Sequence, residues 1–438
     1  MTSLVLKSGT APVADLAPYP NNPRTHTTKQ IRQIARSIER FGWTNPILID
    51  AENGVIAGHG RLEAAKLLGM FEVPVLRLDH MSPAEKRAYV IADNKLAENA
   101  GWDDALLAAE LQGLFDLDIN FDLELTGFET GEIDIILGND VAPEEEPVPG
   151  PDFEAPAVNR QGDLWLIGQH CLICGDCLDR KTWTELLDNE KAQMVFTDPP
   201  YNVRVDGHIS GLGQKRHREF AMASGEMSAA DFTAFLRNTF RYLSEFSEDG
   251  SIHFVCMDWR HMPEVLAASD GIYSELKNLC VWAKSNAGMG SFYRSQHELV
   301  FAFKNGAEAH INNFGLGSNG RHRSNVWEYA GANTFREGRM EDLQAHPTVK
   351  PLQMVADAIL DCSKRGGLIV DAFTGSGTTL LAAARTGRIG AGVEIDPHYA
   401  DLALRRLEAE TGETAVHADT LESFAEMARL RNGEQEDG

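Results

Sequence analysis

The segment from Val370 to Asp396 constrains the fold of this chain more than any other. It reads as an apolar strand ending at Asp371, a glycine turn, an alanine-rich helix and a second strand ending at Glu394. This order is typical of a doubly wound α/β sheet, whose ligands bind at the carboxyl ends of the strands. We therefore expect a Rossmann-like α/β domain with a ligand at this turn.

The residues of this turn favour an adenosyl ligand without phosphates. Glycines let a ligand approach the backbone, and an acid that closes the next strand can bind ribose hydroxyls. The segment lacks both the full Gly-x-Gly-x-x-Gly pattern and the Gly-Lys-Ser/Thr of a phosphate-binding loop. A tight glycine turn that binds nothing is the alternative.

A second motif, Asp198-Pro199-Pro200-Tyr201, follows an apolar run that reads as a buried strand. A carboxylate, two prolines that fix the backbone and an aromatic ring can together hold a planar amine. A plain turn at the end of a strand is the alternative.

Together the two motifs resemble those of the DNA amino-methyltransferases, which carry Asp-Pro-Pro-Tyr as catalytic motif and Phe-x-Gly-x-Gly as the motif for S-adenosylmethionine. The segment 346–351, which contains Lys350, resembles the family segment that touches the methionine end of the cofactor. Gly175-Asp176 resembles the Gly-Asp element that contacts it. The catalytic motif comes first, as in the circularly permuted beta group, and the resemblance covers about residues 160 to 425.

The resemblance implies a site-specific DNA methyltransferase that acts on adenine N6. Because the N6 lone pair is delocalised into the ring, we expect the Asp198 carboxylate and the Pro199 carbonyl to localise it by accepting the amine hydrogens. Tyr201 is expected to stack on the base, which must be flipped out of the duplex. The predicted catalytic residues are Asp198, Pro199, Pro200 and Tyr201, and the predicted cofactor residues are Asp176, Lys350, Asp371, Phe373, Gly375, Gly377 and Glu394.

Two other functions stay open. Cytosine N4 methylation suits the same pocket, and only family resemblance disfavours it, through Asp rather than Ser at position 198. A ParB-like DNA-binding or nucleotide-switch protein, whose methyltransferase half merely binds, is the alternative from another class. Cytosine C5 chemistry needs a cysteine nucleophile, usually after a proline, and none of the 6 cysteines follows one. The recognition sequence and a cognate restriction enzyme are not predicted.

The cysteines predict no metal site. Cys171, Cys174 and Cys177 have zinc-like spacing, but no second Cys-x-x-Cys or His pair completes a tetrahedral site. They read as reduced thiols, and we expect no signal peptide and no membrane-length apolar stretch, so we predict a cytoplasmic protein.

A formal net charge of −25 means that DNA must meet a local basic patch. The expected target-recognition region, about 203–345, contains two such loops, the first beside the Asp198 motif and the second around His310 to Arg323. Arg and Asn read guanine and adenine edges, whereas solvated surface loops are the alternative. The predicted DNA contacts are Arg204, Lys215, Arg216, Arg218, Arg321 and Arg323.

Residues 141–156 hold five prolines and five acids and read as an extended, self-repelling linker. We predict an N-terminal domain with a helical extension over 1–140, the linker over 141–156, the methyltransferase domain over 157–430 and an acidic tail over 431–438. A homodimer is left open.

The N-terminal domain shows a strand at Ile47 to Asp50, a turn at Asn53-Gly54, a second strand, and Gly58-His59-Gly60-Arg61 before a helix from Leu62 to Leu68. A glycine turn at a helix amino terminus is an anion site. This α+β pattern resembles the ParB-like nuclease or sulfiredoxin fold of partition proteins over about residues 10 to 95. Their usual Gly-Glu-Arg-Arg is altered here, which disfavours nucleotide hydrolysis and leaves nucleotide binding open. No separate partition-type DNA-binding domain is predicted, and the fusion resembles those of phages and prophages.

Overall fold

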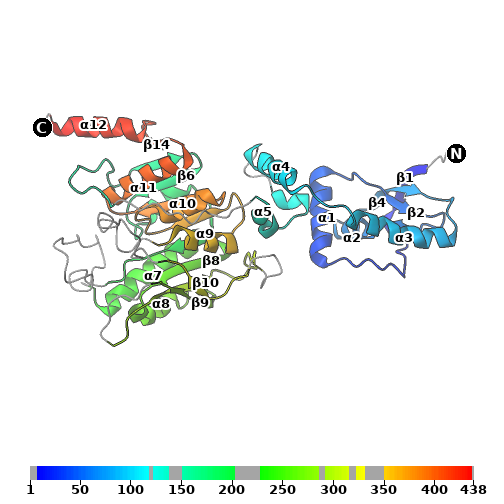
Figure 1. Ribbon diagram of the computed structural model, residues 1–438, viewed down its shortest axis with the longest axis horizontal. Coiled ribbons are helices and arrows are strands. Elements are labelled where there is room, and N and C mark those ends of the chain that lie inside the picture. Colours follow the sequence, from blue (N-terminus) through cyan, green and yellow to red (C-terminus); the bar gives the residue numbers. More distant parts are fainter. Residues whose placement is uncertain are drawn as a thin grey trace. The chain divides into compact units, whose positions relative to one another are not determined.

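The computed structural model describes residues 7–117, 122–137, 150–202, 227–285, 292–314, 322–330 and 350–436. The chain divides into two compact units, Met1–Leu137 and Gly138–Gly438, and each is described by itself (Figure 1). The predicted linker lies outside the described residues as far as residue 149. The finer predicted domain boundaries stay predictions. In the described ranges, no helix has the length and apolar character needed to cross a membrane.

The smaller unit contains a four-stranded sheet in the order β1-β4-β2-β3. Its core holds Ile47, Ile49, Leu62 and Val75. The sequence did not predict β1, because this strand buries only Ala11 of its six residues. The elements of the unit are β1 (Lys7–Pro12), η1 (Val13–Asp15), α1 (Thr28–Phe41), β2 (Ile47–Ile49), β3 (Val55–Ala57), α2 (His59–Leu67), β4 (Glu72–Arg77), α3 (Pro83–Glu98), α4 (Asp104–Leu117), η2 (Leu123–Thr126) and α5 (Thr130–Ile136).

The larger unit is built on a ten-stranded mixed sheet in the order β11-β9-β10-β8-β7-β12-β13-β6-β5-β14. Its centre, β8-β7-β12-β13-β6, is parallel, whereas β10, β5 and β14 pair with antiparallel neighbours. The strands are β5 (Leu164–Ile167), β6 (His170–Cys174), β7 (Ala192–Thr197), β8 (Ser247–Met257), β9 (Glu275–Ala283), β10 (His297–Lys304), β11 (Val326–Glu328), β12 (Leu368–Asp371), β13 (Ile389–Glu394) and β14 (Ala415–His417).

Helices cover both faces of this sheet (Figure 1). On β7, alternate side chains point to opposite faces, because the side-chain period of a strand is two. Met194 and Phe196 join the cluster under α9 (Leu352–Cys362), α10 (Thr378–Arg385) and α11 (Pro397–Thr411). Val195 joins the cluster under α6 (Arg180–Leu187), α7 (Ala229–Glu245) and α8 (Met262–Ser269). Short η3 (Trp259–His261) precedes α8, and α12 (Phe424–Glu436) follows β14. The expected α/β fold is confirmed.

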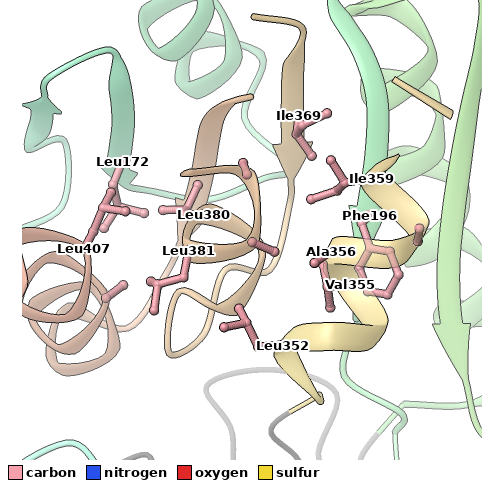
Figure 2. Packing of buried hydrophobic residues seen from close by; sticks show 14 of the residues in the cluster. Leu172, Phe196, Leu352, Val355, Ala356, Ile359, Ile369, Leu380, Leu381 and Leu407 are labelled. Atoms are coloured by element: carbon pink, nitrogen blue, oxygen red, sulfur yellow. The ribbon is translucent and has the colours of Figure 1, made fainter. Parts of the chain in front are cut away.

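Figure 2 shows how the first cluster fixes the strand that carries the Asp198 motif. The Phe196 ring lies against Val355, Ala356 and Ile359 of α9. Phe196 is only 1% exposed, and burying such a side chain stabilises the fold by about 1.5–3 kcal/mol. Packing of this kind sets the position of the carboxyl end of β7.

We expect Phe196→Ala to lower the free energy of unfolding of the larger unit by about 3–5 kcal/mol, because the substitution leaves a cavity under α9. Scanning calorimetry should show a lower midpoint for the transition of this unit. The control is Leu166→Ala on β5, where the side chain is 44% exposed. An equal effect of both substitutions would contradict this assignment of the core.

Candidate active site

The site lies where the crossover direction of the parallel sheet reverses. From β7 the chain runs through α7 to β8 on one side, and from β12 it runs through α10 to β13 on the other. Since β7 and β12 are neighbours, a crevice is expected at their carboxyl ends. Asp198 follows β7 and Asp371 ends β12, so the two sequence motifs meet at one edge of the sheet.

A buried hydrogen-bond set joins these two strand ends. The Thr197 hydroxyl donates to Asp371 Oδ1 at 2.9 Å, and the Thr379 hydroxyl donates to Asp371 Oδ2 at 2.7 Å. The Phe373 N–H also donates to Oδ1, at 3.0 Å. Burial raises the pKa of the Asp371 carboxyl to about 6, although these donors favour its charged form. Asp371 therefore builds the turn, and its predicted contact with a cofactor stays a prediction.

The glycines of the turn have different functions. Gly377 has φ +88°, and a Cβ there would lie 3.0 Å from Ala403 Cβ on α11, so close packing of the helices requires glycine. Gly375 has φ +53°, and a Cβ there would meet nothing nearer than the Phe373 carbonyl oxygen at 4.0 Å. The space beside Gly375 is open, as the approach of a ligand to the backbone requires.

Two carboxylates lie at the ends of the neighbouring strands β13 and β6. Glu394 ends β13, and its carboxylate accepts the Gly375 N–H at 2.7 Å and the Asp396 N–H at 2.8 Å. Burial raises the pKa of Glu394 to about 7. Asp176 follows the neighbouring strand β6, and its Oδ1 accepts the Leu178 N–H at 2.8 Å. With no Lys or Arg from Asp371 to Thr379, the set suits hydroxyl groups and a cation better than a phosphate.

The Asp198 motif belongs to a compact charged cluster. Lys350 Nζ lies 2.6 Å from Asp198 Oδ2 and 3.1 Å from both Glu298 Oε2 and the Tyr201 hydroxyl. The Tyr201 hydroxyl is 2.8 Å from Asp198 Oδ1 and 3.0 Å from Glu298 Oε2. Lys284, which directly follows β9, pairs with the other oxygen of Glu298. Side-chain exposure is 6% for Lys350, 15% for Glu298 and 25% for Asp198, so Asp198 is the most accessible of these three.

Burial and charge compete within this cluster. Burial raises the pKa of Asp198, and the adjacent Lys350 ammonium opposes that rise. Burial disfavours the charged form of Lys350, but the two carboxylates keep its pKa well above the ordinary value. Burial also works against the Glu298 carboxylate, yet Lys350 and Lys284 hold its pKa at about 2. The Lys350 ammonium and the Glu298 carboxylate thus favour each other's charged form, and Lys350 also favours the charged form of Asp198.

The structure brings together the predicted catalytic residues and adds two that sequence reasoning missed. Pro199 is buried and Pro200 is half-buried beside Asp198. Lys350 lies against Asp198, and its predicted contact with the cofactor's methionine end stays a prediction. Lys284 and Glu298 lie in stretches that resemble the family's core strand and the loop beside the target base, but the sequence assigned neither a role, although an acid at the start of the apolar strand β10 is a signal that could have identified Glu298.

Five of the six predicted DNA contacts lie outside the described residues, namely Arg204, Lys215, Arg216, Arg218 and Arg321. Arg323 is described, and its guanidinium binds Asp361 at 2.8 Å and the Tyr329 hydroxyl at 2.9 Å with 16% exposure. A guanidinium held this way stabilises the fold, and the contact of Arg323 with a base edge stays a prediction.

The cysteines and the glycine turn of the smaller unit complete the set of candidates. In the described ranges, no group of three or more His, Cys, Asp or Glu side chains is arranged to hold a metal ion.

The glycine turn of the smaller unit lies at Gly58, which has φ +97° and precedes α2. This helix begins at His59 rather than at Leu62 as predicted. His59 Nε2 accepts the Tyr19 N–H at 3.2 Å, and burial lowers the pKa of His59.

Three family models match consecutive parts of the chain. A ParB N-terminal domain matches residues 6–94, a ParB-methyltransferase HTH domain matches 105–161, and a DNA methylase model matches 192–405. The second match corrects our expectation that no separate DNA-binding domain follows the ParB-like fold. It also extends through the segment predicted as a linker.

Individual proteins resemble each half. The ParB-like nuclease domain-containing protein YnaK of Escherichia coli K12 is 49% identical over 76 residues, which cover 17% of this chain and 87% of YnaK. The type II methyltransferase M2.DpnII of Streptococcus pneumoniae is 28% identical over 229 residues, covering 50% of this chain and 84% of that protein. The crystal structure of the M1.HpyAVI–SAM complex is 18% identical with a TM-score of 0.38, covering 54% of this chain and 98% of that one.

We expect Thr197→Val to destabilise the larger unit by about 1–3 kcal/mol, because the buried Asp371 carboxylate loses one donor while it stays buried. Thr233→Val is the matched control, since the exposed Thr233 hydroxyl bonds only to the Ala229 carbonyl of its own helix. Denaturant unfolding of both variants measures the difference. Equal stabilities would show that the Thr197–Asp371 bond does not hold the strand ends together.

Proposed function

We propose, from the premise that the chain belongs to the DNA N6-adenine/N4-cytosine methyltransferases and carries a ParB-like N-terminal domain, that it methylates N6 of adenine in DNA. The cofactor is S-adenosylmethionine. The observation that carries the proposal is the position of Asp198 and Pro199 at the end of β7, beside the Gly375 turn at the end of β12. An amine acceptor and an adenosyl site thus share one edge of the sheet.

The proposed chemistry requires acceptors rather than a strong base. An exocyclic amine of adenine is a poor nucleophile until hydrogen bonds to its two hydrogens localise the nitrogen lone pair. The Asp198 carboxylate and the Pro199 carbonyl are the acceptors we assign. When bound, the cofactor supplies a methyl group on a positively charged sulfur. Asp198 then accepts the proton that the methylated nitrogen releases.

The acidic strand ends fit this cofactor. Asp176 and Glu394 offer carboxylate oxygens to ribose hydroxyls, and the open space at Gly375 admits the adenosyl group. The carboxylates around the crevice also favour a ligand with a positive charge and no phosphates. The contacts of Phe373 and Gly377 with the cofactor belong to the same proposal.

The choice of adenine over cytosine depends on the residue at position 198. Family resemblance associates Asp there with adenine, and cytosine N4 remains the second candidate because it offers the same kind of amine. The base must leave the duplex to reach Asp198, and stacking on Tyr201 offsets part of a cost of a few kcal/mol.

We propose that the other parts of the chain serve the same DNA. The ParB-like and helix-turn-helix regions supply contacts to DNA, and the basic residues of 204–218, which lie outside the described residues, supply further contacts. Nucleotide binding at Gly58 to Arg61, a homodimer, a cytoplasmic location and a phage or prophage origin stay predictions.

The direct test supplies isotope-labelled S-adenosylmethionine and unmethylated DNA of diverse sequence, then identifies the labelled nucleoside by mass spectrometry. We expect labelled N6-methyladenine from the native protein and none from Asp198→Ala, with cofactor and DNA binding retained. Glu185→Ala, on the exposed face of α6, should behave as the native protein. Labelled N4-methylcytosine would establish the second candidate, and native activity in Asp198→Ala would refute the catalytic assignment.

Cofactor affinity should rise by about tenfold from pH 6 to pH 8. In the protein without cofactor, the Glu394 carboxyl has a pKa of about 7, and the hydroxyl donors of the cofactor bind its charged form. Glu394 is largely protonated at pH 6 and ionised at pH 8, so binding at low pH must first release a proton. Isothermal titration calorimetry at both pH values measures this change. Glu394→Gln should remove most of the dependence, and an affinity independent of pH in the native protein would contradict the role of Glu394.

A further inference from the structure

Lys350 is the centre of the charged cluster beside Asp198. Its ammonium group has three hydrogens and three acceptors, namely Asp198 Oδ2 at 2.6 Å, the Tyr201 oxygen at 3.1 Å and Glu298 Oε2 at 3.1 Å. The side chain is only 6% exposed. A buried ammonium whose hydrogens are all accepted is held in one position. Lys350 therefore fixes Asp198, Tyr201 and Glu298 relative to one another.

The Tyr201 hydroxyl adds a second constraint. It has one hydrogen but lies within hydrogen-bond distance of two carboxylates, Asp198 at 2.8 Å and Glu298 at 3.0 Å. It can donate to only one of them at a time. The carboxylate that does not receive the Tyr201 hydrogen is stabilised by the Lys350 ammonium, because this positive charge lies next to both carboxylates. Without Lys350, the Asp198 carboxylate would have no ammonium beside it and would face the Glu298 carboxylate across the Tyr201 hydroxyl.

The balance of charge around Asp198 involves groups from every strand at this edge. Glu298 of β10 is paired with both Lys350 and Lys284, and it therefore competes with Asp198 for the Lys350 ammonium. Among the residues that the structure describes, the ionisable side chains that interact with this centre are Tyr201 after β7, Cys256 on β8, Lys284 after β9, Glu298 on β10, Lys350 before α9 and Asp371 on β12.

We infer that Lys350 and Glu298 are positioning residues that set the charge of Asp198 in opposite directions: Lys350 keeps the Asp198 carboxylate ionised and turned toward the crevice, and Glu298 limits how strongly Lys350 binds it. The inference rests on the proposed function, in which an ionised Asp198 accepts the hydrogens of the amine. Lys350 thus acts on the reaction through Asp198, without bonding to the base.

The reaction needs an intermediate strength of binding between the Lys350 ammonium and the Asp198 carboxylate. If Lys350 bound Asp198 alone, the carboxylate would be ionised but its oxygens would be less available to the amine. Without Lys350, burial and the Glu298 charge would favour the protonated form of Asp198, and a protonated carboxyl has less acceptor capacity for the hydrogens of the amine because one oxygen carries a proton. Glu298 and Lys350 together leave Asp198 both charged and accessible.

The test is the pH dependence of the single-turnover rate of methyl transfer, which separates chemistry from product release. Lys350→Met should move the acid limb of this profile up by about 1–3 pH units, as loss of an adjacent opposite charge does. Glu298→Gln should move the same limb down by about one pH unit, since a like charge is removed. Lys350→Arg should restore most of the native profile, because it keeps the positive charge.

The control variants are Glu275→Gln and Lys277→Met on β9, an exposed ion pair of the same sheet with Nζ and Oε1 3.1 Å apart. Both should leave the profile unchanged. Cofactor binding and thermal unfolding identify any variant that fails to fold. If Lys350→Met fails to fold, Glu298→Gln decides the matter, because a residue that only supports the fold would not move the acid limb downward.

An acid limb that stays in place in Glu298→Gln, or that moves upward, overturns the inference. A limb that does not rise in a folded Lys350→Met variant also overturns it. These failures differ from failure of the proposed function, which would appear as native activity in Asp198→Ala. Loss of activity in Asp198→Ala together with an unmoved limb in Glu298→Gln would leave the proposed function intact and remove only this inference.

Discussion

The site depends on the neighbouring positions of β7 and β12, whose ends are held together by the bond between the Thr197 hydroxyl and the Asp371 carboxylate. Parallel strands that lead to opposite sides of a sheet leave a crevice between their carboxyl ends. Residues nearly two hundred positions apart in the chain, Asp198 and Gly375, are thereby placed at the same edge. The hydrophobic packing of Phe196 near the carboxyl end of β7 and the polar bonds of Asp371 at the carboxyl end of β12 together set the geometry of that edge.

The site contains two groups of acidic side chains that differ in the donors they bind. Asp371 and Glu394 accept mainly from hydroxyl and backbone N–H donors, and burial raises the pKa of both carboxyls although these donors oppose the rise. Asp198 and Glu298 are instead satisfied by a buried ammonium. The first group suits a neutral or cationic ligand, and the second supports an acceptor that must stay charged in an apolar surrounding. One crevice therefore offers two environments for carboxylates, one for a cofactor and one for an amine.

Local sequence patterns predicted the parts of the fold that depend on interactions between residues close together in the chain. The strand, glycine turn and helix around Gly375 were readable because Gly and apolar spacing act within a few residues. The sequence assigned no role to Glu298, since its partners Lys350 and Tyr201 are distant from it in the chain. Arg323 was read as a DNA contact because residue type alone does not show that Asp361 already binds it. The match to an HTH domain over residues 105–161 was not predicted, because the helices of this region carry no short residue motif that identifies such a domain.

The most direct test is a crystal structure of the protein with a DNA duplex and a non-reactive analogue of S-adenosylmethionine. The account predicts an adenine outside the helix stack, with its amine nitrogen within hydrogen-bond distance of both the Asp198 carboxylate and the Pro199 carbonyl. The analogue should lie over Gly375 with its ribose at Glu394. A flipped base that binds away from Asp198, or an analogue bound elsewhere than the ends of β12 and β13, would contradict it.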